Sequence, residues 1–240
     1  MLMRLDKFIA AAEPLSRAEV KQLLRQGRVA VDGAVVTQGE TKLDPETARV
    51  CLDGRDLTWA AHHYYMMNKP AGVLSATEDG AGKTVLDLMG EAERRFGLFP
   101  AGRLDKDAEG LLILTDDGDF CHRLISPKSG VEKTYYAETA APVPAAAPAA
   151  FAAGLTLGDG TRCLPAKLEL FGEGECRAVV KVTEGKYHQV KRMLAAVGSP
   201  VTYLKRTAEG GLRLDESLPP GAWRPLSPAE REAVFCKIRA

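Results

Sequence analysis

One loop of the chain carries residue types and a spacing suited to chemistry. It reads Ala-Gly-Arg-Leu-Asp-Lys-Asp-Ala-Glu-Gly over residues 101–110, so that Asp105 lies between the cations Arg103 and Lys106. A carboxylate held next to an arginine stays ionised and can act as a nucleophile or as a base. The sequence therefore makes Asp105 the first candidate for a reacting group.

A second polar string, Glu-Gly-Lys-Tyr-His-Gln-Val-Lys-Arg-Met, covers residues 184–193. It leads into a segment with helical spacing of apolar residues over 188–197, and Lys191 and Arg192 lie near the beginning of that predicted helix. One interpretation makes His188 a general base. We favour the other interpretation, in which it orders the loop.

Short elements must hold these two strings in place. The apolar run Leu111–Thr115 predicts a buried strand, and we expect Asp116–Gly118 after it to form a turn and a helix cap rather than a metal site. Val179–Val182 predicts another strand directly before the second polar string. Further short helices are expected over residues 84–89 and after Pro144 in the alanine-rich stretch.

The first sixty residues predict a small basic unit. Apolar side chains recur at helical spacing over Leu5–Ala12, and Ser16–Glu19 is a capping box that opens a second helix with Gly27 as its stop. Four cations fall within a narrow arc beside the buried stripe of this helix, and they repel one another unless an anion neutralises them. These cations are Arg17, Lys21, Arg25 and Arg28. A phosphate backbone is the natural anion, and Asp32–Gly33 predicts a hairpin turn after the helix.

The composition fits a soluble intracellular protein. The 240 residues have a formal net charge of zero, but cations gather over residues 1–31 and 181–206, which indicates either a directed nucleic-acid footprint or two solvated helix faces. The five cysteines are scattered without a Cys-x-x-Cys pair, so neither a disulfide framework nor a zinc site is expected. Charged residues at positions 4, 6 and 7 argue against a signal peptide. No apolar run approaches the roughly 20 residues that span a bilayer. We expect a cytoplasmic protein.

Several motifs resemble known families. Arg-Leu-Asp-Lys-Phe over residues 4–8 and Ser-Arg-x-x-x-Lys-x-Leu-x-x-x-Gly-x-Val over 16–29 resemble the alpha-L RNA-binding motif. The Arg-Leu-Asp loop, Asn-Lys-Pro-x-Gly over 68–72, Glu-Lys-Thr-Tyr over 132–135 and the 184–193 string resemble the pseudouridine synthases. Tyr-His-Gln-Val-Lys-Arg-Met within that last string is similar to the branch that modifies small-subunit ribosomal RNA.

This resemblance implies an α+β fold, in which a small helix–helix–hairpin domain over residues 1–58 precedes a domain over 61–240 with a central antiparallel sheet and flanking helices. It also implies an isomerase, which breaks the bond between one uracil and its ribose, rotates the base and rejoins it through carbon. The expected substrate is 16S ribosomal RNA, in a partly assembled small subunit. No metal or other cofactor and no membrane partner is expected, and the chain is expected to act as a monomer.

The resemblance also assigns roles to individual residues. Asp105 would be the nucleophile or base, Tyr135 would stack on the uracil, and Lys191 would hold Asp105 ionised. Lys69 would buttress the loop of Asp105. The residues expected to contact RNA are Arg103, Arg192, Arg206, Arg4, Lys7, Arg17, Lys21, Arg25 and Arg28.

Three alternatives remain at this point. The first is the same chemistry on large-subunit (23S) RNA. The second is a non-catalytic RNA-binding or ribosome-assembly factor, against which Asp105, Tyr135 and Lys191 are all present. The third is phosphoryl transfer, for which residues 81–84 match only the tail of the phosphate-binding loop motif.

Overall fold

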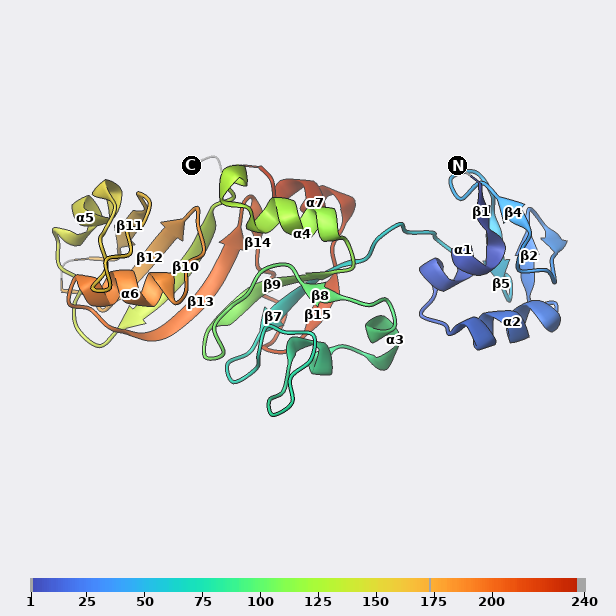
Figure 1. Ribbon diagram of the computed structural model, residues 1–240, viewed down its shortest axis with the longest axis horizontal. Coiled ribbons are helices and arrows are strands. Elements are labelled where there is room, and N and C mark those ends of the chain that lie inside the picture. The colour runs from blue at the N-terminus through green and yellow to red at the C-terminus, as the bar shows by residue number, and fades with distance from the viewer. Residues whose placement is uncertain (1, 173, 237–240) are drawn as a thin grey trace. The chain divides into compact units, whose positions relative to one another are not determined.

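The computed structural model describes residues 2–172 and 174–236, and the chain divides into two compact units (Figure 1). The units comprise residues 1–63 with 89–98 and residues 64–88 with 99–240. The domain limits expected from the sequence stay a prediction. Over the described ranges, no helix is both long enough and apolar enough to pass through a membrane.

Two helices of the first unit begin and end where the sequence predicts. The first, α1 (Leu5–Ala12), buries its apolar side chains, and α2 (Arg17–Arg25) begins with the predicted capping box. Ser16 Oγ accepts a hydrogen bond from the Glu19 backbone N–H at 3.3 Å, and the Glu19 carboxylate accepts one from the Ser16 N–H at 2.7 Å. Gly27 follows with φ +67°, a left-handed conformation that ends the helix.

A small sheet in the order β3-β2-β5-β6 completes the first unit, and β1 pairs separately with β4. The elements are β1 (Met3–Arg4), β2 (Val29–Val31), β3 (Ala34–Val35), β4 (Lys42–Leu43), β5 (Val50–Leu52), β6 (Arg55–Asp56) and the short helix α3 (Glu91–Arg94). Asp32 and Gly33 have φ of +50° and +84° between β2 and β3, which confirms the predicted hairpin turn. The core contains Leu5, Phe8, Ile9, Val20, Leu24, Val29, Leu43 and Val50.

The second unit is built on a nine-stranded sheet with the main order β11-β12-β10-β13-β9-β7-β15. Its strands are β7 (Tyr64–Lys69), β8 (Phe99–Pro100), β9 (Glu109–Thr115), β10 (Lys133–Thr139), β11 (Lys167–Leu170), β12 (Arg177–Val182), β13 (Val201–Glu209), β14 (Leu212–Arg213) and β15 (Trp223–Pro225). The sheet is mostly antiparallel, as expected, but β9 and β13 pair in parallel. The α+β class predicted from the sequence is confirmed.

Short helices flank this sheet, with α5 beside β11 and α7 beside β14 (Figure 1). The helices are η1 (Val85–Leu88), α4 (Gly118–Ile125), η2 (Pro127–Ser129), α5 (Ala147–Ala153), α6 (Gln189–Ala196) and α7 (Pro228–Ala233). Asp117 caps α4, because its carboxylate accepts the backbone N–H of Phe120 at 3.0 Å. This position confirms the prediction that the Asp116–Gly118 stretch is a turn and a cap. The helix predicted after Pro144 is also present.

The strand β9 is the centre of the second core. It pairs with β7, β8 and β13, and its residues Leu111–Leu114 are 0% exposed. At its start Gly110 has φ +103°, and a Cβ there would lie 2.2 Å from the Arg206 carbonyl oxygen. Only glycine allows the two backbones to approach this closely. The loop of Asp105 therefore leads directly into the most rigidly packed strand of the unit.

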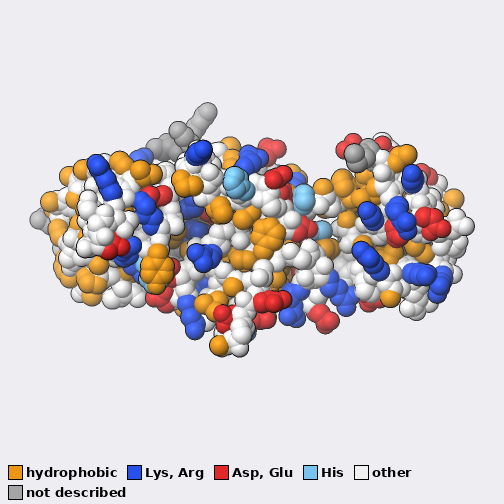
Figure 2. Space-filling model, in the orientation of Figure 1, with side chains coloured by type: hydrophobic (Ala, Val, Ile, Leu, Met, Phe, Trp, Pro, Cys, Tyr) orange, Lys and Arg blue, Asp and Glu red, His pale blue; other side chains and the backbone are white. Residues whose placement is uncertain are grey.

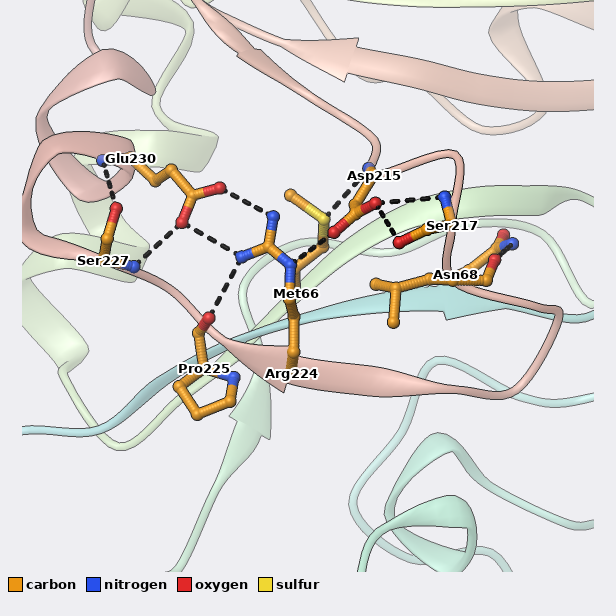
Figure 3. A network of polar contacts seen from close by, with 9 residues as sticks. Met66, Asn68, Asp215, Ser217, Arg224, Pro225, Ser227 and Glu230 are labelled. Carbon is orange, nitrogen blue, oxygen red and sulfur yellow. Dashed lines mark hydrogen bonds and ion pairs between the residues drawn. The ribbon is translucent and has the colours of Figure 1, made fainter.

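Arg224 fastens the C-terminal part of the second unit (Figure 3). Its Nε donates to Asp215 at 2.6 Å, and its two terminal nitrogens donate to the Glu230 carboxylate at 3.0 and 2.7 Å. Hydrogen bonding to this guanidinium lowers the pKa of Glu230 to about 2. The network links β15 to the turn before it and to α7 after it.

Candidate active site

Asp105 lies in the loop between β8 and β9, with its side chain 23% exposed. One carboxylate oxygen, Oδ2, is 3.0 Å from Lys191 Nζ at the first turn of α6. The other, Oδ1, is 3.6 Å from His188 Nε2. The structure thus brings together the two polar strings that the sequence analysis singled out, although 86 residues separate Asp105 from Lys191.

Lys191 joins two carboxylates, because its ammonium also donates to Asp107 Oδ1 at 2.5 Å. Burial lowers the pKa of Lys191, but the hydrogen bonds to Asp107 and Asp105 outweigh burial and leave that pKa above its ordinary value. The same ammonium lowers the pKa of Asp107. Lys191 therefore stays charged, and its ammonium contacts both carboxylates.

Tyr135 lies on β10 directly opposite Arg206 on β13, and it faces the same cleft as Asp105. Burial raises the pKa of the Tyr135 phenol, and the neighbouring Arg206 opposes that rise. The phenol is therefore protonated at neutral pH. Its ring forms part of a wall that also includes the apolar side chains of Val182 and Leu204, which suits the flat face of a base.

The prediction that Arg206 contacts RNA does not fit its position. Its side chain is 2% exposed, its Nε donates to the Leu111 carbonyl at 2.8 Å, and a terminal nitrogen lies 3.6 Å from the buried Glu209 carboxylate. A guanidinium enclosed in this way cannot reach a phosphate backbone. Arg206 instead supports Tyr135 from within the sheet.

Lys69 binds the backbone of the Asp105 loop. Its side chain is 0% exposed, and Nζ lies 2.7–3.2 Å from the carbonyl oxygens of Pro70, Asp105, Lys106 and Ala108. Burial lowers the pKa of Lys69 to about 8. The expected buttress is present, because one ammonium binds three backbone carbonyls of the loop, those of Asp105, Lys106 and Ala108.

Ser75 is a second support, which the sequence analysis did not find. Its hydroxyl donates to the Leu104 carbonyl at 2.9 Å and accepts the Leu104 backbone N–H at 3.0 Å. Both backbone polar groups of Leu104, the residue before Asp105, are therefore hydrogen-bonded to the same side chain. A single serine carries no signal of this contact in the sequence, so only the fold reveals it.

The string 184–193 forms the facing side of the cleft and is fixed by its own polar contacts. The buried Glu184 accepts from Gln189 Nε2 and from Lys186 Nζ, each at 2.7 Å, and from the Leu164 backbone N–H at 2.8 Å. His188 caps α6 in a left-handed conformation with φ +47°, which directs its ring toward the cleft.

The other predicted RNA contacts of the second unit lie nearby. Arg103 is exposed and lines the cleft. Arg192 instead forms an ion pair with Asp159 at 2.5 Å, and it also donates to the Tyr187 carbonyl at 3.4 Å. Part of the Arg192 guanidinium is therefore already bound to a carboxylate, and the prediction that it contacts RNA stays a prediction.

In the first unit, all six of the predicted cations are exposed on the surface: Arg4, Lys7, Arg17, Lys21, Arg25 and Arg28. Two of them also pair with aspartates. Arg28 lies beyond the end of α2, not on it, and pairs with Asp53, while Arg4 pairs with Asp6 at 2.6 Å. Figure 2 shows Lys and Arg side chains over this unit, at the right of the view, with acidic side chains among them.

Within residues 2–172 and 174–236, no group of three or more His, Cys, Asp or Glu side chains is placed to hold a metal ion. The chemistry that this cleft can supply comes from a paired carboxylate, a phenol and an ammonium. Those groups can move a proton or attack an electrophilic carbon next to a bound base.

The chain is similar to proteins of known family. Residues 63–196 match the family model described as RNA pseudouridylate synthase, and residues 3–48 match the S4 domain. A solved structure described as the crystal structure of pseudouridylate synthase is 39% identical and superimposes with a TM-score of 0.68, covering 97% of this chain and 99% of that one.

Curated relatives match over nearly their whole length. An uncharacterized RNA pseudouridine synthase of Bacillus subtilis is 44% identical over 95% of this chain and 96% of its own. The ribosomal small subunit pseudouridine synthases A of Vibrio cholerae and Escherichia coli are 44% and 42% identical, over 97% of this chain and 100% of theirs. With Asp105, Tyr135 and Lys191 all inside the matched region, the chain belongs to the RNA pseudouridine synthase family.

Proposed function

We propose that this chain converts one uridine of small-subunit ribosomal RNA to pseudouridine, with Asp105 as the reacting carboxylate. The observation that carries the proposal is the contact of Asp105 with Lys191, 3.0 Å apart at a cleft that Tyr135 also lines. A carboxylate that contacts an ammonium beside an aromatic wall is an arrangement suited to reaction at a bound base.

The reaction needs no other reactant. The bond between uracil N1 and ribose C1′ breaks, the uracil rotates, and a bond from C5 to C1′ forms; C5 loses a proton and N1 gains one. Asp105 serves as nucleophile or base in this sequence, and Lys191 stabilises its negative charge before it reacts and again when it is released. Tyr135 stacks on the uracil, and its protonated phenol donates a hydrogen bond.

The uridine must leave its stack to reach the cleft, which costs a few kcal/mol and least at an unpaired base. Binding elsewhere on the RNA has to offset this cost. The exposed cations of the first unit supply sequence-tolerant attraction to phosphates. This role predicts that RNA affinity falls as salt rises, and that it falls less steeply in a variant with Arg17, Lys21 and Arg25 replaced by glutamine.

The choice of small-subunit RNA rests on the relatives of Vibrio cholerae and Escherichia coli, which are named for that substrate. The similarity covers the full length of those proteins, so it includes the first unit as well as the second. We further propose that the chain acts as a monomer in the cytoplasm and meets its substrate in a partly assembled subunit.

The test is pseudouridine mapping of small- and large-subunit ribosomal RNA after incubation with the wild-type chain. Each RNA is offered naked and as a partly assembled subunit, and the Asp105→Asn variant is the control. One new pseudouridine in small-subunit RNA, absent with the variant, is the expected result. A new site only in large-subunit RNA would contradict the substrate, and no new site with RNA still bound would favour a binding factor.

A further inference from the structure

Tyr187 is an exposed aromatic residue at the edge of the cleft. It is 76% exposed, and its ring stacks on the His188 ring with centroids 3.8 Å apart and planes 17° from parallel. The residue lies in the loop between β12 and α6. Most of its ring surface is therefore open to a flat ligand.

His188 connects this exposed ring to the reacting group. Its side chain lines the cleft, and its Nε2 is 3.6 Å from Asp105 Oδ1. Tyr187 stacks on this same imidazole. The His188 side chain therefore lies between the Tyr187 ring and the reacting carboxylate. A nucleotide next to the target uridine in the same RNA strand can span this separation.

The loop holds Tyr187 in place before any ligand arrives. On one side of it, the Lys186 backbone N–H donates to Gln189 Oε1 at 2.9 Å, and Lys186 Nζ reaches the Arg162 carbonyl at 2.6 Å. On the other side, the His188 carbonyl accepts the Arg192 backbone N–H at 2.9 Å, the first hydrogen bond of α6. A side chain positioned in advance loses little conformational freedom on binding, so its contacts contribute more to affinity.

We propose that Tyr187 stacks on the base of the nucleotide next to the target uridine and forms the outer wall of the substrate site. This inference rests on the proposed function. When a uridine leaves its stack, the adjacent base loses a partner, and an aromatic ring at the edge of the cleft replaces that partner. Stacking of this kind tolerates any base, because every base has a π-face.

The test measures dissociation constants for an RNA segment of about 30 nucleotides centred on the uridine that mapping identifies, a length that exceeds the span of one cleft. Truncation of a base-stacking aromatic weakens RNA binding by about 10-fold or more. We expect Tyr187→Ala to weaken binding by that amount and Tyr187→Phe to bind like the wild type. The matched control is Phe171→Ala, which removes another aromatic side chain, 54% exposed, that does not line the cleft.

A second RNA decides whether the ring acts on a base. Its sequence is the same, but one flanking nucleotide lacks its base. The wild type and Tyr187→Ala should bind equally when the missing base is the one that Tyr187 contacts. Unchanged affinity of Tyr187→Ala for intact RNA would overturn the inference, and so would an equal loss with every abasic RNA.

The wild-type chain reports separately on the proposed function. If it modifies neither ribosomal RNA, the proposed function fails, and the same binding comparison is made with full-length small-subunit RNA. There, loss of affinity in Tyr187→Ala but not in Tyr187→Phe supports stacking on RNA. Equal affinities of all variants would overturn it.

Discussion

Replacing Lys69 with methionine tests how the reacting loop is held. The substitution keeps most of the side-chain volume in a site that is 0% exposed, and it removes the ammonium. Three N–H donors are lost from a position where four carbonyl oxygens lie 2.7–3.2 Å away. The variant therefore separates the hydrogen bonds of Lys69 from its packing.

The structure indicates the size of the effect. The carbonyls of Asp105 and Lys106 keep a second, backbone donor, so the loss falls mainly on the carbonyls of Pro70 and Ala108. A buried acceptor left without its partner costs about 1–3 kcal/mol, which gives about 2–6 kcal/mol for two. Part of this is offset because no charged group is desolvated any longer. We expect the free energy of unfolding to fall by about 3 kcal/mol.

The assay is urea unfolding followed by circular dichroism, with turnover measured on the same samples. Lys106→Met, an exposed lysine of the same loop, is the control and should change the free energy of unfolding by no more than about 0.5 kcal/mol. Displacement of Asp105 should lower the turnover of Lys69→Met by about 100-fold. A variant with wild-type turnover and a loss below about 1 kcal/mol would refute the buttress.

Three further predictions concern the site and its frame. Lys191→Met should lower kcat by about 100-fold while RNA affinity changes little, because the charge it provides acts on the reacting carboxylate; single-turnover kinetics and filter binding measure the two. Gly110→Ala should lower the free energy of unfolding by about 3 kcal/mol or more in urea, because its φ of +103° and the adjoining strand leave no room for a Cβ. The contribution of Glu230 to stability should be complete above its unfolded pKa of 4.5 and be lost as pH falls toward about 2, its folded pKa. Acid titration of unfolding should therefore be shallower in Glu230→Gln, which has no carboxylate to protonate.

The elements that local signals define could be predicted from the sequence. The capping box at Ser16, the hairpin at Asp32 and Gly33, and the helix cap at Asp117 depend on a few adjacent residues. Each reflects hydrogen bonds or backbone angles that residue type largely decides. For that reason their positions agree with the structure to within a residue or two.

Partners that are distant in the chain could not be predicted in this way. Arg206 looks like a surface cation in the sequence, but the pairing of β13 between β9 and β10 buries it beside Glu209. Similarly, Arg192 on α6 pairs with Asp159, which lies in the loop between α5 and β11. No spacing rule encodes these contacts, because they depend on which strands become neighbours.

The reacting residues were predictable in part: their motifs are local, but their contacts join distant parts of the chain. Asp105 and Lys191 were found through the motifs that contain them, whereas the contact between them exists only in the folded sheet. Ser75 and Tyr187 were not assigned roles, since a lone serine and an exposed tyrosine are common in any chain. Their positions next to the cleft become visible only with the fold.

The central claim is that Asp105, and not the aspartate beside it, carries the reaction. Both Asp105 and Asp107 contact the Lys191 ammonium, at 3.0 and 2.5 Å, so Asp107→Asn is a matched control for Asp105→Asn. The most direct measurement is pseudouridine formation by both variants in a single turnover, with RNA binding measured alongside. We predict no product from Asp105→Asn with RNA affinity retained, and product from Asp107→Asn. Pseudouridine formed by Asp105→Asn would contradict the account.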